Sequence, residues 1–215
     1  MAFAVILGGN AALADDLNLG GNYVPVTIDE NGTSTTVGGG PITISHLNGT
    51  QLTYVYCVGL FTDVYVPDDY PDTLVTRNGV VDGAAVNNAG EIAWLLDNFA
   101  AAAAASTIDQ QALQAAIWHV EYDGTGVNTG WPVVTGDSTQ SYYTQYHTDI
   151  SSLGTAPVSD INWFSPGDGT ATVYQGLVGP LIPGEVPEPT SILLFGTVVL
   201  FAVRSVKRKR LGAGR

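Results

Sequence analysis

The chain has 215 residues, 45% of them hydrophobic, which is enough to bury the core of one sizeable domain and excludes a disordered tail. All twenty acidic residues lie between Asp15 and Glu188, whereas six of the seven basic residues follow Val203. Because so acidic a surface repels phosphate groups, nucleic acid is excluded as a partner.

The first fourteen residues are apolar and end in Ala12, Leu13 and Ala14, which is a small-x-small pattern. The pattern predicts that residues 1–14 are the remnant of a signal peptide, with the positively charged start lying further upstream. A short segment of the core is the alternative. Export implies oxidising conditions, in which the single cysteine, Cys57, has no partner for a disulfide.

Short extended runs separated by turn residues follow, and they are typical of an antiparallel β meander. Residues 23–28 and 41–45 alternate apolar and polar side chains, and the glycine run 38–40 indicates a turn between them. Residues 51–61 form the longest β-prone stretch, and Cys57 lies near its end.

An acidic segment with two prolines comes next, at residues 66–72. Pro67 and Pro71 have no N–H to donate to a neighbouring strand. We therefore predict a solvated loop here, and neither a helix nor a central strand.

Two helices are predicted after this loop. Asn88 and Glu91 have the spacing of a capping box, and an apolar stripe follows over residues 92–99. Thr107 repeats the arrangement at the start of a second helix over residues 108–122.

The second helix carries the residues of greatest interest. Gln114, Trp118 and Glu121 lie at offsets of four and seven, on a line next to the predicted core face, so the glutamine points along the edge of that face. The core face itself consists of Ile108, Leu113, Ile117 and Val120.

Beyond the helices the pattern returns to short elements. Residues 141–150 predict a short helix, and residues 160–164 and 170–175 predict a closing hairpin. We therefore predict an α+β fold for an ectodomain at 15–179, mainly an antiparallel β-sandwich or barrel with a two-helix insertion.

The tail has three parts. A linker over residues 180–189 ends in Pro187, Glu188 and Pro189, and residues 190–210 contain a short apolar run followed by a basic cluster. This order resembles the PEP-CTERM sorting signal of Gram-negative bacteria. The resemblance implies recognition by an exosortase, a transient membrane anchor through the C-terminal hydrophobic helix, and delivery to the cell surface or extracellular matrix.

Cys57 and Gln114 together offer the side chains of an internal thioester. Such a bond forms when the cysteine sulfur attacks the glutamine carboxamide carbon and ammonia leaves. The two groups must be held together in a dry place, and a cysteine at the end of a strand and a glutamine on a helix, both among apolar residues, meet this requirement.

The residues around this pair resemble the Cys-Gln thioester domains of bacterial surface proteins. Those domains have an aromatic-Cys pair, here Tyr56 and Cys57, and later a motif of the type Thr-Gln-x-Ala-Ile-Trp, here residues 113–118. Leu113 stands where threonine is usual. The resemblance implies that Cys57 and Gln114 are the thioester pair.

Three further side chains are candidates for a supporting role: Trp118, Glu121 and His119. His119 has a pKa range suited to proton transfer, but it lies five residues from Gln114 on another side of the helix. A surface or structural histidine is the alternative reading of it. The sequence has no nucleophile-histidine-acid triad, no phosphate-binding glycine loop and no metal-ligand spacing, so we expect neither an enzyme nor a cofactor.

Lysine is absent before Lys207. The mature ectodomain would thus contain no side-chain amine to consume its own thioester, although selection for solubility alone is an equal explanation. We expect single-turnover covalent attachment to an amine or hydroxyl on a surface or an exopolysaccharide, in adhesion or biofilm. The alternative is a passive structural or carbohydrate-binding matrix protein in which Cys57 is a buried free thiol.

Overall fold

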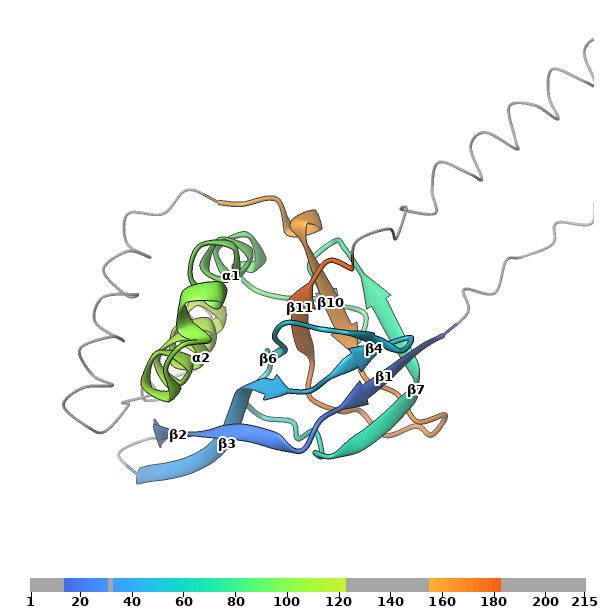
Figure 1. Cartoon of the computed structure of the whole chain (residues 1–215), viewed down its shortest axis with the longest axis horizontal. Coiled ribbons are helices and arrows are strands. Elements are labelled where there is room, and N and C mark those ends of the chain that lie inside the picture. The colour runs from blue at the N-terminus through green and yellow to red at the C-terminus, as the bar shows by residue number, and fades with distance from the viewer. Residues whose placement is uncertain (1–13, 31–32, 123–154, 183–215) are drawn as a thin grey trace, which may run out of the picture. The chain divides into compact units, whose positions relative to one another are not determined.

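The computed structural model of the protein describes residues 14–30, 33–122 and 155–182, which form a curled antiparallel sheet and two helices (Figure 1). The main sheet of this part of the chain has seven strands in the order β5-β4-β1-β7-β10-β11-β6. Two hairpins, β2-β3 and β8-β9, form separate two-stranded sheets. The prediction of a mainly antiparallel fold with two helices is confirmed.

The elements have the following bounds. The strands are β1 (Asp15–Leu19), β2 (Asn22–Glu30), β3 (Thr33–Thr43), β4 (His46–Leu47), β5 (Thr50–Gln51), β6 (Tyr56–Cys57), β7 (Asp68–Thr76), β8 (Val80–Val81), β9 (Ala84–Ala85), β10 (Ile161–Ser165) and β11 (Leu177–Pro180). The helices are α1 (Ala89–Ala103), α2 (Thr107–Tyr122) and a 3-10 turn, η1 (Val158–Asp160).

Strand β7 lies between β1 and β10, so the prediction of a loop across the acidic segment is wrong. The register explains why Pro71 is tolerated in a central strand. Asp15 pairs with Thr73 but Leu17 pairs with Tyr70, which leaves two residues of β7 outside the regular ladder. In this bulge, the missing N–H of Pro71 removes no hydrogen bond between the strands.

The glycine run 38–40 lies inside β3, and the prediction of a turn there is wrong. Gly39 pairs with Val24 of β2 in the hairpin ladder. The run packs against β6 so closely that a Cβ atom on Gly40 would lie 2.6 Å from the Cα atom of Tyr56. Close approach of the two backbones, and not chain reversal, is the reason for these glycines.

Helix α1 begins directly after Asn88, as predicted, but the predicted capping box does not form. Asn88 has a left-handed backbone (φ 52°), and its side chain makes no cap hydrogen bond. Its Nδ2 atom instead donates to the carbonyl of Val120 at 2.7 Å. Asn88 therefore joins the start of α1 to the last turn of α2.

Helix α2 begins at Thr107, and its first turn is capped by Ser106, whose Oγ accepts from the N–H of Asp109 at 3.4 Å. The predicted core face is largely confirmed, with Ile108 only half-buried. The two helices and the inner side of β6, β10 and β11 share one core, to which α2 contributes Ala112, Leu113, Ala116, Ile117 and Val120.

Two of the predicted strands differ from those in the structure: the first is much shorter than predicted, and the second lies further along the chain. The chain between β5 and β6 crosses from one end of the main sheet to the other, so residues 51–61 cannot pair along their length. The closing hairpin is β10-β11, and its second strand lies at Leu177–Pro180 and not at 170–175. Residues 168–174 are instead held by hydrogen bonds to the carboxylate of Asp168, which accepts from the N–H of Thr170 and from the hydroxyl of Tyr174.

The chain divides into one unit at Met1–Leu181 and a second at Ile182–Arg215. The predicted signal-peptide remnant, the helix predicted at 141–150 and the hydrophobic sorting helix all lie outside the described residues, apart from Ala14. Among the residues that are described, no helix combines the length and apolarity needed to cross a membrane.

Candidate functional site

Cys57 and Gln114 lie in direct contact in the folded protein. Strand β6 carries Cys57, helix α2 carries Gln114, and both residues are buried, with exposed fractions of 2% and 0%. The Nε2 atom of Gln114 donates to the Cys57 carbonyl at 2.8 Å, and its Oε1 atom accepts from the Cys57 N–H at 2.9 Å. The glutamine was predicted at the edge of the buried face, and the structure buries it completely.

A third strand completes the surroundings of the carboxamide. The Gly40 N–H of β3 donates to Gln114 Oε1 at 2.7 Å, so this oxygen accepts from two backbone donors. Two N–H groups aimed at one carbonyl oxygen have the form of an oxyanion hole, which stabilises negative charge that develops on the oxygen during attack at the carbon. The arrangement thus polarises the carboxamide towards a nucleophile.

The thiol of Cys57 shares this environment. Burial raises its pKa to about 12, the neighbouring Gly40 N–H lowers it, and the negative charge of Glu121 raises it further. The thiol is therefore neutral at pH 7, and its attack on the carboxamide requires transfer of its proton. The Gly40 N–H that lowers the thiol pKa donates its hydrogen bond to the carboxamide oxygen of Gln114 at 2.7 Å.

The glycines of β3 make room for this contact. A Cβ atom on Gly39 would lie 2.6 Å from Gln114 Cγ and 3.3 Å from Trp118 Cη2. A Cβ atom on Gly40 would lie 2.6 Å from both the Tyr56 Cα atom and the Val55 carbonyl oxygen. A Cβ atom at either position would displace a neighbouring group, because Cβ contacts shorter than 3.0 Å are essentially absent from real proteins.

The last turn of α2 makes two hydrogen bonds to the segment that follows Cys57 in the chain. Glu121 Oε2 accepts from the Gly59 N–H at 2.8 Å, and the Tyr122 hydroxyl accepts from the Leu60 N–H at 2.9 Å. Burial raises the pKa of Glu121 to about 7, although the Gly59 hydrogen bond opposes this shift. Glu121 is thus a carboxyl group that exchanges protons near neutrality, next to the strand that carries the thiol.

This pKa gives a testable dependence of stability on pH. A group whose pKa rises from 4.5 to about 7 on folding stabilises the fold below 4.5, and the contribution is lost as the pH rises through 7. We expect the free energy of unfolding of the wild type, relative to Glu121→Gln, to fall by on the order of 3 kcal/mol across this interval. Denaturant unfolding at several pH values measures it, and parallel curves for both proteins would contradict the assignment.

Trp118 and His119 are both buried, with exposed fractions of 1% and 5%. Of the two alternatives for His119, the surface position is wrong, whereas a buried structural histidine agrees with the structure. The residue does not line the cavity beside Cys57. Trp118 does line that cavity, next to Cys57.

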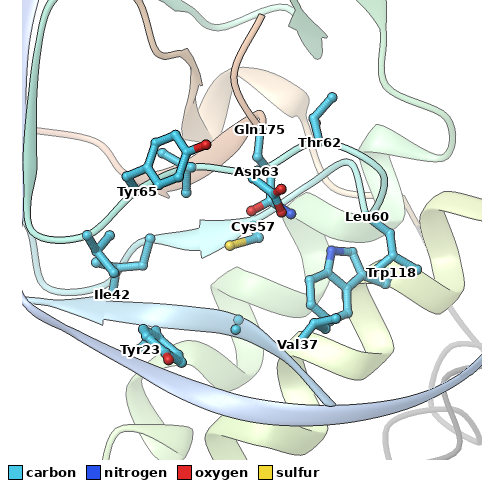
Figure 2. A pocket seen from close by; sticks show the side chains of 14 residues that line it. Tyr23, Val37, Ile42, Cys57, Leu60, Thr62, Asp63, Tyr65, Trp118 and Gln175 are labelled. Atoms are coloured by element: carbon cyan, nitrogen blue, oxygen red, sulfur yellow. The ribbon is translucent and has the colours of Figure 1, made fainter. Parts of the chain in front are cut away.

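The cavity has a volume of about 330 Å³ and opens on the thiol side of β6 (Figure 2). Figure 2 shows the sulfur of Cys57 and the indole of Trp118 facing it, below the loop that carries Asp63 and Tyr65. Sequence reasoning missed Asp63, Gly39 and Gly40, because these residues reach the site only through contacts between distant segments.

Metal ligands are not gathered anywhere in the described ranges, where no three His, Cys, Asp or Glu side chains form a group able to hold an ion.

The comparison with protein families places the PEP-CTERM protein-sorting motif at residues 185–209. This motif implies an exported protein that is processed by an exosortase and transiently anchored in the membrane. A comparison with curated proteins and a comparison with solved structures each gave no match.

Proposed function

We propose that this exported protein forms an internal thioester between Cys57 and Gln114 and uses it once, to attach itself covalently to an amine or hydroxyl outside the cell. The observation that carries the proposal is the Gln114 carboxamide, held by two backbone N–H donors against the residue that supplies the thiol. The sorting motif supports the extracellular setting. Attachment consumes the bond, so the protein acts as a reagent and not as an enzyme.

Bond formation conserves atoms and charge. Cys57 Sγ attacks the carboxamide carbon of Gln114, the carbon–nitrogen bond breaks, and the nitrogen leaves as ammonia after taking up the thiol proton. The N–H groups of Gly40 and Cys57 stabilise the oxyanion of the intermediate. Glu121, whose pKa of about 7 lies near neutrality, is the carboxyl group suited to carry the proton.

The second step is transfer to the target. The nitrogen of an amine or the oxygen of a hydroxyl attacks the thioester carbonyl, the sulfur–carbon bond breaks, and the nucleophile gives its proton to the departing thiolate. The product is an amide or ester on the side chain of residue 114 and a free thiol on Cys57. The described residues contain no lysine, so intramolecular attack by a lysine is excluded there.

Intact mass spectrometry tests the proposal. Purified wild-type protein is expected to be lighter than its sequence mass by one ammonia, and to gain the mass of methylamine on treatment with that amine. The Cys57→Ala variant has no sulfur nucleophile, and its mass should equal its sequence mass before and after treatment. A wild-type mass equal to the sequence, with Cys57 open to alkylation after unfolding only, would indicate a buried free cysteine in a passive matrix protein and sink the thioester.

A further inference from the structure

The turn between β7 and β8 carries an Asn-Gly pair whose carboxamide takes no part in the fold. Asn78 is exposed, and its side chain makes no hydrogen bond within the described residues. The turn itself is closed by the Thr76 hydroxyl, which donates to the Val80 carbonyl at 2.8 Å. Asn78 therefore lies on an ordered turn, with its carboxamide in contact with solvent.

The backbone nitrogen of the next residue is also uncommitted. The N–H of Gly79 has no hydrogen-bond acceptor in the described part of the chain, whereas the Gly79 carbonyl accepts from the Val86 N–H at 2.8 Å. Because glycine has no Cβ atom, no side chain of its own hinders the approach of this nitrogen to the carboxamide carbon of the preceding residue. The turn thus places a nucleophilic nitrogen directly after a reactive carboxamide.

A second Asn-Gly pair has the opposite surroundings. Asn48 and Gly49 form the turn between β4 and β5, and the Asn48 side chain is bound on both sides. Its Oδ1 atom accepts from the Asp16 N–H at 2.9 Å, and its Nδ2 atom donates to Asp15 Oδ1 at 2.7 Å. Any reaction of this carboxamide must first break both hydrogen bonds.

We propose that Asn78 is a site of spontaneous modification, which converts to aspartate and isoaspartate through a cyclic imide formed with Gly79. The Gly79 nitrogen attacks the carboxamide carbon of Asn78, the carbon–nitrogen bond of the carboxamide breaks, and ammonia leaves with the proton of the Gly79 N–H. Water then opens the ring at one of its two carbonyl groups. One opening restores the normal main chain as aspartate, and the other routes the main chain through the side chain as isoaspartate.

The isoaspartate form has a structural consequence, because it adds a methylene group to the main chain directly before Gly79. Gly79 has little space in which to move: a Cβ atom on it would lie 3.0 Å from the Cβ atom of Ala89, the first residue of α1. Its carbonyl also accepts the hydrogen bond of Val86, in the segment that leads to this helix. We therefore expect isoaspartate at residue 78 to destabilise the start of α1.

This reaction does not depend on the thioester, and the masses of the two products distinguish them. Thioester formation leaves the protein lighter than its sequence mass. The completed modification of Asn78 replaces an amide by a carboxyl group and leaves the protein heavier. The test uses full-length Cys57→Ala, in which no thioester can form, so failure of either proposal leaves the other standing.

The experiment is incubation of Cys57→Ala in mildly alkaline buffer, followed by peptide mapping with mass spectrometry. We expect residue 78 to convert at least about tenfold faster than residue 48, whose two hydrogen bonds oppose the reaction. In urea, where the fold is lost, the two rates should become similar, because both asparagines precede glycine. Peptide mapping also separates both from the Asn-Gly pair at residues 31–32, which lies outside the described residues. Equal rates in the folded protein, or conversion at residue 78 only after unfolding, would overturn the proposal.

Asn78→Gln, made in Cys57→Ala, is the matched variant for the effect on stability. It keeps a carboxamide on the turn, but its reaction requires a larger ring, which closes more slowly. After the same incubation, this variant should unfold at an unchanged denaturant concentration, whereas Cys57→Ala alone should unfold at a lower one. Conversion at other residues affects both proteins equally. Identical unfolding of the two incubated proteins, with isoaspartate present at residue 78 in Cys57→Ala, would overturn the link between this turn and α1.

Discussion

Replacement of Gln114 by alanine is expected to destabilise the protein by about 4 kcal/mol and to abolish the loss of ammonia. Three buried hydrogen bonds disappear together in Gln114→Ala: two donated to Oε1 and one donated by Nε2. The N–H groups of Gly40 and Cys57 and the Cys57 carbonyl then remain buried without partners. Each such group costs on the order of 1–3 kcal/mol, and the removed side-chain atoms add a cavity.

The matched control is Gln111→Ala on the same helix. Gln111 Nε2 donates a single hydrogen bond, to the Pro25 carbonyl at 2.6 Å, in an exposed position. We expect its loss to cost about 1 kcal/mol at most and to leave the mass deficit unchanged. Denaturant unfolding and intact mass spectrometry of the two variants make the comparison. Equal stabilities would show that the Gln114 hydrogen bonds contribute little to the fold.

Gln114→Glu is a variant in which the stability of the site can be measured without thioester formation. Glutamate is also the residue that hydrolysis of the thioester would leave at position 114. As a neutral acid, the new side chain can accept from the two N–H groups and donate to the Cys57 carbonyl, as Gln114 does. As a carboxylate it would face that carbonyl with negative charge. Folding therefore raises the pKa of the new group, so the variant is expected to lose stability as the pH rises, relative to Gln114→Ala.

Cys57 and Gln114 could be singled out from the sequence because their signals are local. A single cysteine after an aromatic residue and a glutamine on a well-marked helix are visible without knowledge of the fold. The sequence did not indicate that Gln114 is completely buried. Helical periodicity places Gln114 beside the core face, but a second sheet, the β2-β3 hairpin, packs over that edge and buries it.

Two of the incorrect predictions, the turn at the glycine run and the loop at the two prolines, have a common physical cause. Glycine and proline were interpreted by their local preferences, whereas tertiary contacts decide their role at two positions of this chain. Gly40 is required by the approach of β6, and Pro71 is accommodated by a bulge opposite β1. Asp63 could not be recognised either, since an aspartate in a loop becomes part of a cavity only when distant segments, here Trp118 and Tyr23, form the other walls.

Replacement of Gly40 by alanine is expected to destabilise the protein by about 4 kcal/mol and to prevent thioester formation, although no reactive group is removed. The new Cβ atom would lie 2.6 Å from the Tyr56 Cα atom and from the Val55 carbonyl oxygen, which are backbone atoms and cannot rotate away. Overpacking usually costs about 1–3 kcal/mol, and more where no side chain can yield. Strands β3 and β6 must separate, and this moves the Gly40 N–H away from Gln114 Oε1.

Gly21→Ala is the matched control for Gly40→Ala, because a Cβ atom on Gly21 would have no neighbour within 4 Å. We expect Gly21→Ala to be as stable as the wild type or slightly more stable, since alanine reduces the entropy of the unfolded chain. Its mass should still be one ammonia below the sequence mass. If Gly40→Ala instead unfolds like the wild type and loses ammonia to completion, strands β3 and β6 accommodate the Cβ atom, and the close approach of their backbones at residue 40 is not required for the reaction.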